Sequence, residues 1–381
     1  MSEPRANAIQ CGALVAAALS GTWRDPPPTP DLSSDDLALA SPLLVATGGG
    51  ACTWWALRGS PLRTSPAAGP LHAMYRLQAL QADGHEAQLI RVLGTLREAG
   101  VEPLLSKGWA MARLYPRPGL RPYSDLDLYV DADALPKTRD ALAALNLREK
   151  YVDLNARPRD LADRPFEELW RRSLVLPIGT EQVRVPCRED LLRQGCVHFL
   201  RHGARWPRTL CDVALLLETP PSALDWDYLL GGDPRRTAWV VTVLRLAMAL
   251  LGARPVGQPP SRLVGAPPDW LKQAVLAEWG TERPRTGVRV KPSPNAAAPT
   301  RVSDSRRREF IHAGWHFWAK RTNPVWTSLH LGLSPNVRPS RGQRFAYAMS
   351  IRVKRFAMAG QVLLLDPIKR GRSRLATGPG R

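Results

Sequence analysis

The stretch that decides the fold is residues 106–130, SKGWAMARLYPRPGLRPYSDLDLYV. The apolar residues 101–106 predict a short strand that enters this stretch, and Trp109–Tyr115 predicts a helix that Pro116 ends. A loop rich in proline and glycine then leads to Leu126–Val130, which predicts a second strand. The stretch therefore predicts a strand, a turn, a short helix and a returning strand.

The residues that follow extend this pattern. Asp131–Asn146 predicts a second helix, and Arg148–Leu154 predicts a third strand. Strands that alternate with helices predict a small α/β unit over about residues 90–155.

Two acidic residues, Asp125 and Asp127, lie at the mouth of the second predicted strand. Side chains alternate faces along a strand, so these two carboxylates point the same way, about 7 Å apart. Such a pair is often only a solvated strand edge, but a hard divalent cation such as Mg²⁺ also neutralises it. Upstream, Lys107-Gly108 ends the first predicted strand at the start of a helix, where a phosphate group is favoured. Together these features predict the two halves of a nucleoside-triphosphate site.

Two further polar residues precede the carboxylates. Arg121 suits a clamp on phosphate oxygens, or an internal salt bridge to Asp125 or Asp131 that fixes the loop. Ser124 either caps the turn or contacts substrate.

The order of these motifs resembles the bacterial uncharacterised nucleotidyltransferase family of the DNA polymerase beta-like nucleotidyltransferase superfamily. The matching residues are Lys107-Gly108, Tyr115-Pro116, Gly119-Leu120-Arg121-Pro122 and Asp125–Val130. A looser similarity extends over roughly residues 70–250 and includes Phe166–Arg171 and Cys196–Leu217.

The resemblance implies a Mg²⁺-dependent (or Mn²⁺-dependent) transfer of a nucleoside monophosphate from a nucleoside triphosphate to an unknown hydroxyl acceptor, with release of pyrophosphate. Asp125 and Asp127 would hold the cation, and Lys107, Gly108, Arg121 and Ser124 would bind the nucleotide. The family usually carries its third carboxylate in a Glu-Leu-His segment, which Asp153-Leu154-Asn155 matches here with the histidine replaced. Asp153 would complete the metal site, and the replacement leaves open a nucleotide-binding protein with impaired catalysis.

The implied fold class is α+β, with a small mixed-sheet nucleotidyltransferase core of the polymerase beta-like type embedded in a mostly helical chain. Outside the core, the clearest predicted helices are His72–Ala99, Glu189–His202, Pro207–Glu218 and Thr237–Leu251. We expect four parts: a helical region over 1–90, the nucleotidyltransferase core over 91–187, a helical domain over 188–280 and a basic region over 281–381.

Two pairs of histidines have the spacing of neighbours on one helix face, which suits either zinc binding or a packed pair of rings. His198 and His202 lie four residues apart, as do His312 and His316, but neither pair has an obvious third ligand. A packed or hydrogen-bonded pair is the favoured interpretation, with Asp212 as a candidate partner of His198 and His202.

The net charge of +19 is concentrated at one end of the chain. Residues 281–381 hold 21 Lys and Arg against 4 Asp and Glu, which leaves residues 1–280 close to neutral. This basic region suits a solvated extension with one or two helices, a docking surface for an acidic partner, or a nucleic-acid-binding arm of a regulator.

Two further features bear on location. Five scattered cysteines without a CxxC pair are typical of a reduced, cytoplasmic protein. No apolar run reaches the roughly 18 residues of a membrane span.

Overall fold

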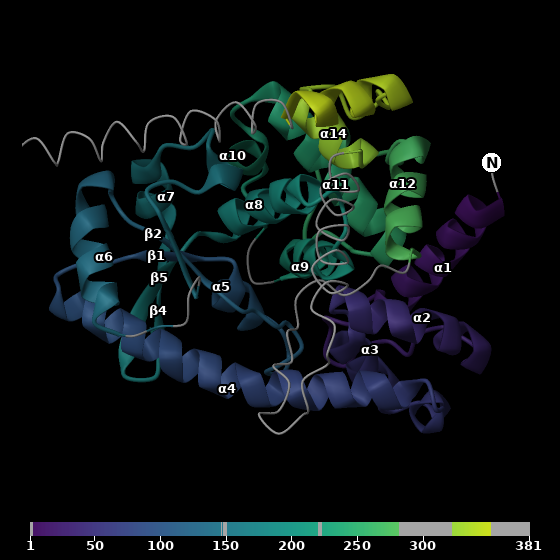
Figure 1. The fold of residues 1–381 in the computed structure, drawn as a ribbon, viewed down its shortest axis with the longest axis horizontal. Coiled ribbons are helices and arrows are strands. Elements are labelled where there is room, and N and C mark those ends of the chain that lie inside the picture. The colour runs from purple at the N-terminus through teal and green to yellow at the C-terminus, as the bar shows by residue number, and fades with distance from the viewer. Residues whose placement is uncertain (1–2, 146, 148–150, 220–222, 282–321, 352–381) are drawn as a thin grey trace, which may run out of the picture. The chain divides into compact units, whose positions relative to one another are not determined.

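The computed structural model describes residues 3–145, 147, 151–219, 223–281 and 322–351. The chain divides into two compact units, one of residues 1–290 with 334–336 and one of residues 291–333 with 337–381. The first unit has an α+β fold and contains all the strands of the described residues (Figure 1).

A five-stranded mixed sheet forms the centre of the α+β fold, with strand order β3-β2-β1-β5-β4. The strands are β1 (Leu104–Ser106), β2 (Leu126–Tyr129), β3 (Val152–Asn155), β4 (Leu174–Ile178) and β5 (Glu181–Val185). Strand β1 pairs antiparallel with β2 and parallel with β5, whereas β2 and β3 are parallel. The three strands predicted from the sequence are thus adjacent in the sheet.

The hairpin of β4 and β5 lies within the core expected over 91–187, but its two strands were not predicted from the sequence. The hairpin contains Pro177 in β4 and Gly179 at its turn. Both are accommodated because β4 is an edge strand, where a missing N–H is tolerated, and Gly179 turns the chain with a φ of 54°.

Helices make up most of the first unit, as expected. Those before the sheet are α1 (Glu3–Leu19), α2 (Ser34–Thr47), α3 (Gly50–Leu57) and α4 (Ala68–Glu98). Those among the strands are α5 (Gly108–Ala112), α6 (Leu135–Ala143) and α7 (Phe166–Arg172). Those after the sheet are α8 (Arg188–Arg201), α9 (Pro207–Glu218), α10 (Trp226–Leu230), α11 (Pro234–Leu251) and α12 (Asp269–Trp279). Short 3₁₀ turns lie at Pro61–Thr64, Ala132–Ala134, Arg159–Leu161 and Ser261–Leu263.

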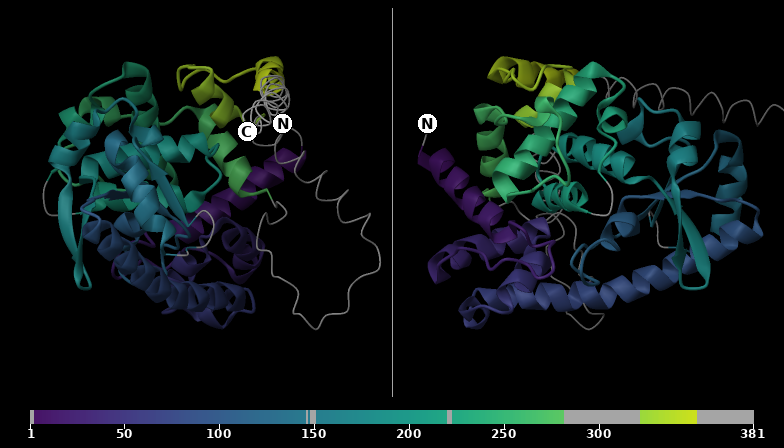
Figure 2. Two further views of the ribbon diagram at one scale, coloured as in Figure 1. Left: turned by 60° about the vertical axis from the view of Figure 1, so that its left-hand side comes forward. Right: turned by 180° about the vertical axis from the view of Figure 1, so that it is seen from behind.

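The long helix α4 joins the N-terminal helices to the sheet. It packs against α2 and α3 near its start and against β5 and α6 farther along, as Figures 1 and 2 show. Helices α8 and α9 pack on each other and on α11, and their inward faces are almost entirely buried. The core of this unit therefore holds α8 and α9 in a fixed position, from which both contribute residues to the cavity described below.

The second unit contains α14 (Pro324–His330) and a helical segment over residues 341–351. The Asn323 side chain caps α14 by accepting a hydrogen bond from the Trp326 amide, and the Trp326 ring packs on Tyr347 with centroids 5.5 Å apart. The predicted helix over 306–320, most of the one over 341–365 and the predicted tail over 369–381 lie outside the described residues.

Candidate active site

The turn after β1 brings Lys107 and Gly108 against the start of β2. Lys107 has a φ of 51° and Gly108 a φ of 27°, so the chain turns sharply through a region that favours glycine. A Cβ on Gly108 would lie only 3.3 Å from the backbone oxygen of Asp125. The close approach explains the glycine. Helix α5, which follows, has only five residues and ends before the predicted helix over Trp109–Tyr115 does.

Three carboxylates converge at this end of the sheet. Asp127 lies in β2 and is 7% exposed, whereas Asp125 precedes the strand and is exposed. The parallel register of β2 and β3 places Asp153 directly beside Asp127. Burial raises the pKa of Asp127, and the charges of Asp125 and Asp153 raise it further, against the lowering effect of Lys107. These three side chains therefore act on one another electrostatically.

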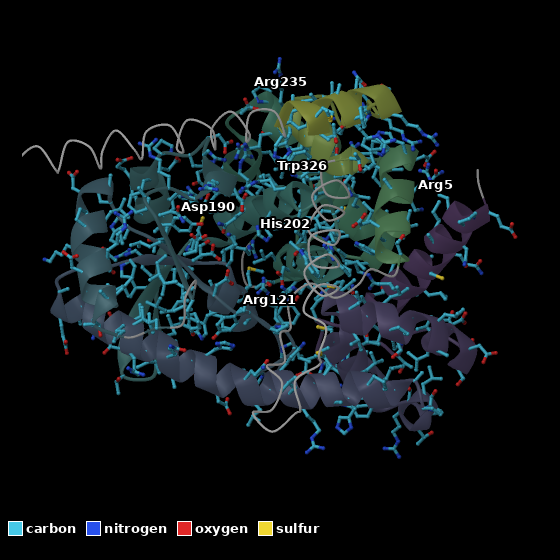
Figure 3. The ribbon with its side chains drawn as sticks, in the orientation of Figure 1. Arg5, Arg121, Asp190, His202, Arg235 and Trp326 are labelled. Carbon is cyan, nitrogen blue, oxygen red and sulfur yellow. The ribbon has the colours of Figure 1, made fainter. Side chains whose placement is uncertain are left out.

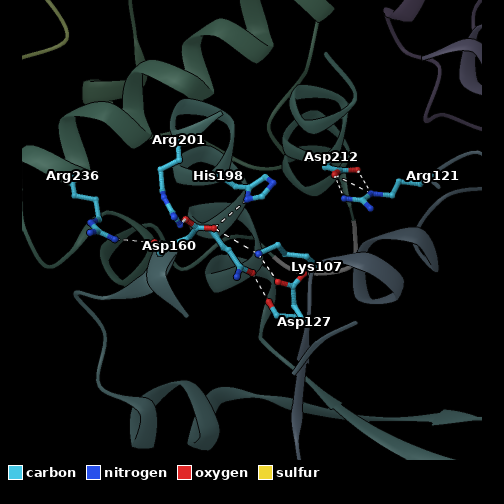
Figure 4. Close-up of polar contacts among 10 residues, drawn as sticks. Lys107, Arg121, Asp127, Asp160, His198, Arg201, Asp212 and Arg236 are labelled. Carbon is cyan, nitrogen blue, oxygen red and sulfur yellow. Dashed lines mark hydrogen bonds and ion pairs between the residues drawn. The ribbon is translucent and has the colours of Figure 1, made fainter. Parts of the chain in front are cut away.

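A network of ion pairs connects these acids to α8 (Figure 4). The Lys107 ammonium donates to Oδ1 of Asp127 at 2.7 Å and lies 3.9 Å from Oδ2 of Asp160. Asp160 is buried, with His198 Nδ1 at 3.2 Å from its carboxylate and Arg201 bonded to it. Burial acts to raise the pKa of Asp160, but the hydrogen bond from His198 and the nearby positive charges hold it well below its usual value. Asp160 therefore stays ionised as the centre of the network.

Arg121 forms an internal ion pair. Its Nη2 donates to Oδ2 of Asp212 at 2.9 Å, and Tyr115 donates to Oδ1 of the same carboxylate at 2.9 Å. The sequence suggested Asp125 or Asp131 as the partner of Arg121, and His198 as a partner of Asp212. The observed partners differ from these two predictions because Asp212, in α9, lies within hydrogen-bonding distance of Arg121.

A cavity of about 410 Å³ lies over these residues, a size in the range of small-molecule sites. All seven residues predicted for metal or nucleotide binding line it, and they are Lys107, Gly108, Arg121, Ser124, Asp125, Asp127 and Asp153. Arg121 and His202, labelled in Figure 3, both line the cavity in the region of α8 and α9.

Several residues of the cavity were missed by sequence reasoning. They include Arg157, Arg159, Asp160, Arg201, Trp206 and Arg208. Arg208 is the most informative: burial and the charge of Arg121 lower its pKa to about 10, and it pairs with no carboxylate in the described ranges. No local motif marks these positions, because α8, α9 and the loop after β3 bring them in from outside the predicted motif.

The donor set suits a hard cation but is not arranged around one. Asp125, Asp127 and Asp153 offer only carboxylate oxygens, the ligands that Mg²⁺ prefers. Within the part of the chain that the structure describes, no three His, Cys, Asp or Glu side chains are grouped closely enough to hold a metal ion. Lys107 instead takes the place of a cation on Asp127.

The pair of His198 and His202 packs ring on ring, with centroids 4.4 Å apart. This packing agrees with the structural interpretation of their spacing. The second pair, His312 and His316, lies outside the described residues.

Comparison with known proteins places the chain in a family. The model of a family described as "Uncharacterised nucleotidyltransferase" matches residues 51–162 and 151–251, which together span more than half of the chain. No curated protein and no solved structure matches. The matched span contains every residue of the cavity, and the chain belongs to the uncharacterised nucleotidyltransferase family.

Proposed function

We propose that this protein transfers a nucleoside monophosphate from a nucleoside triphosphate to a hydroxyl acceptor in a Mg²⁺-dependent (or Mn²⁺-dependent) reaction. The observation that carries the proposal is the meeting of Asp125, Asp127 and Asp153 with the Lys107-Gly108 turn in one cavity. Family membership supports the reaction class. The proposal includes a polymerase beta-like nucleotidyltransferase core formed by the five-stranded sheet.

In this proposal the three carboxylates hold the cation. A bound Mg²⁺ would neutralise triphosphate charge and orient the phosphates. Lys107 is ionically paired with Oδ1 of Asp127, so a cation held by this carboxylate would compete with Lys107 for it. An ammonium group displaced in this way would lie beside the phosphate site, because its backbone is part of the turn at Gly108.

The triphosphate is bound on the β1 side of the cavity. Gly108 lets the backbone approach a phosphate closely, and Ser124 offers a hydroxyl at the same loop. Arg208 adds an unpaired guanidinium, with its Nη1 3.3 Å from the backbone oxygen of Pro122. Arg121 lines the same wall, where Asp212 holds its guanidinium in place.

The acceptor hydroxyl attacks the α-phosphorus. An O–P bond forms, the bond from the α-phosphorus to the bridging oxygen breaks, and pyrophosphate leaves. In this proposal Asp153, an exposed carboxylate in register with Asp127, accepts the hydroxyl proton.

A second candidate is a nucleotide-binding protein that has lost turnover. The observation that favours it is the 2.7 Å hydrogen bond from Asn155 Nδ2 to Oδ1 of Asp153, because Asn155 stands where the family usually has histidine. The two candidates differ in pyrophosphate release but share Mg²⁺-dependent nucleotide binding.

We place this activity in a reducing compartment, the cytoplasm, because all five cysteines are free thiols. None of the described helices is both long and apolar enough to cross a bilayer. The proposed acidic partner of the basic region 281–381 remains a separate proposal, since most of that region lies outside the described residues.

Calorimetric titration with a non-hydrolysable nucleoside triphosphate, with and without Mg²⁺, tests the proposal. Asp125→Asn with Asp127→Asn should weaken Mg²⁺-dependent binding at least about tenfold. The matched control is Asp131→Asn with Asp133→Asn, a second exposed Asp-x-Asp pair that does not line the cavity. Equal binding by both double variants would show that the site is misassigned. Pyrophosphate release against a panel of alcohols and sugars then separates the enzyme from the non-catalytic candidate.

A further inference from the structure

The charged side chains of the cavity are not fully paired. Four carboxylates line it, at Asp125, Asp127, Asp153 and Asp160, and six cations line it, at Lys107, Arg121, Arg157, Arg159, Arg201 and Arg208. Lys107 pairs with Asp127, Arg201 with Asp160, and Arg121 with Asp212. Among the residues that the structure describes, Arg157, Arg159 and Arg208 form no ion pair with a carboxylate, although the charges of Asp212 and Asp125 act on Arg208 from a distance and raise its pKa against the larger lowering effect of burial.

The three unpaired arginines come from two sides of the cavity. Arg208 contacts the backbone of Pro122, next to Tyr123, whose ring faces Gly108. This is the β1 side, where the proposed function places the triphosphate. Arg157 and Arg159 follow β3, which lies on the opposite side of β2 from β1. They line the same cavity as Asp153, the residue proposed to receive the acceptor's proton.

The loop that carries Arg157 and Arg159 is firmly anchored. Its Asp160 side chain is bonded to His198 and Arg201, and its Asp160 backbone oxygen accepts a hydrogen bond from Arg236 at 2.9 Å (Figure 4). Pro158, between the two arginines, is buried. Both arginine side chains are nevertheless exposed to the cavity. The anchored backbone keeps both arginines at the cavity, and their exposed guanidinium groups offer forked donors to an anion, although the two side chains must still become ordered on binding.

We propose that Arg157 and Arg159 bind a phosphate group carried by the acceptor, so that the hydroxyl-bearing substrate is a phosphorylated molecule. Two guanidinium groups match the charge of a phosphate monoester, about −1.5 to −2 at neutral pH, and their forked donors match its oxygens. The inference rests on the proposed function for the identity of the reaction, but the anion site itself is tested by binding alone.

The test uses inorganic phosphate as the probe and the full-length protein saturated with Mg²⁺ and a non-hydrolysable nucleoside triphosphate, which blocks the triphosphate side. Phosphate should bind this complex, and Arg157→Gln with Arg159→Gln should weaken phosphate binding at least about tenfold while the nucleotide affinity stays within about twofold. Arg208→Gln should do the reverse. The matched control, Arg139→Gln with Arg235→Gln, removes two exposed arginines that do not line the cavity and should change neither affinity.

Three results would overturn the inference. These are no phosphate binding by the wild-type complex, undiminished phosphate binding by the Arg157 and Arg159 variant, or a loss of nucleotide affinity in that variant as large as in Arg208→Gln. Failure of the proposed function is a different result, in which Asp125→Asn with Asp127→Asn leaves Mg²⁺-dependent nucleotide binding unchanged. If the protein binds no nucleotide, phosphate is titrated into the same variants in the absence of nucleotide, and the same losses of phosphate affinity are expected.

Glycerol 3-phosphate and glycerol extend the test to the acceptor class. We expect glycerol 3-phosphate to compete with inorganic phosphate, and glycerol, which lacks the phosphate, not to compete. Equal competition by acetate would contradict the assignment to phosphate and point to a carboxylate instead.

Discussion

The ammonium group of Lys107 lies 2.7 Å from Oδ1 of Asp127. A side chain from the turn proposed to bind phosphate is therefore hydrogen-bonded to a carboxylate proposed to bind the cation. Lys107 adopts a φ of 51° to reach it, a conformation that costs free energy in any residue with a Cβ. The turn and the acid pair therefore form one charged unit, in which a cation of the proposed function would compete with Lys107 for Asp127.

The backbone cost at Lys107 can be separated from the role of its charge. Lys107→Gly and Lys107→Ala both remove the ammonium, and both should lower Mg²⁺-dependent nucleotide affinity about tenfold or more. Because only glycine adopts a positive φ without strain, the glycine variant should be more stable by about 1 kcal/mol. Denaturant unfolding measures the difference. Equal stability of the two variants would argue against the positive φ.

Gly108→Ala should disturb the acid pair directly. The added Cβ would lie 3.3 Å from the backbone oxygen of Asp125 at a φ of 27°, so we expect a loss of roughly 1–3 kcal/mol and weaker Mg²⁺-dependent nucleotide binding. The control is Gly84→Ala in α4, where a Cβ meets nothing within 4 Å. That change should stabilise the protein by up to about 1 kcal/mol, because alanine favours a helix interior. A Gly108→Ala protein as stable as the wild type would contradict the close approach.

Asp212→Asn should destabilise the protein because it leaves Arg121 without its buried counter-charge. Loss of one member of a buried pair costs roughly 3–5 kcal/mol. Asp225→Asn is the comparison: it removes the more exposed pair with Arg172 while an asparagine still caps α10, so its cost should stay below about 1 kcal/mol. Thermal and denaturant unfolding measure the stability of both variants. Similar losses of unfolding free energy in the two would contradict the role of Asp212 as a buried partner of Arg121.

Asp160 gives the stability a defined dependence on pH. Its pKa is lowered in the folded protein, so its stabilising contribution is complete above the unfolded value of about 3.9 and is lost as the pH falls through the folded value. Asp160→Asn should therefore be less stable than the wild type at pH 7, and the difference should shrink below about pH 4. Unfolding across pH 2–7 measures this, with Asp140→Asn on α6 as an exposed control. A stability difference between the wild type and Asp160→Asn that grew as the pH fell would contradict a lowered pKa of Asp160 in the folded protein.

Local patterns in the sequence predicted residues that line one cavity. Strand alternation put Asp125 and Asp127 on one face, and both line the cavity although β2 begins only at Leu126. The turn at Gly108 was recognisable from its neighbours. Asp153 is near Asp127 because β3 pairs with β2 in a particular register, which the family resemblance suggested and the strand pairing provides.

The rest of the site depends on packing between distant segments. Arg121 meets Asp212 across 91 positions of sequence, and Asp160 meets Arg201 across 41. Neither pair carries a local signal, since a single acidic residue in a loop or helix has many possible partners. Arg208 was missed for the same reason.

The most direct measurement is a crystal structure of the protein with Mg²⁺ and a non-hydrolysable nucleoside triphosphate. The account predicts a cation bound by Asp125 and Asp127, phosphates against the turn at Gly108, and the Lys107 ammonium moved from Asp127 to a phosphate oxygen. A triphosphate bound elsewhere, or bound here with Lys107 still paired to Asp127 and no cation on the acids, would contradict it.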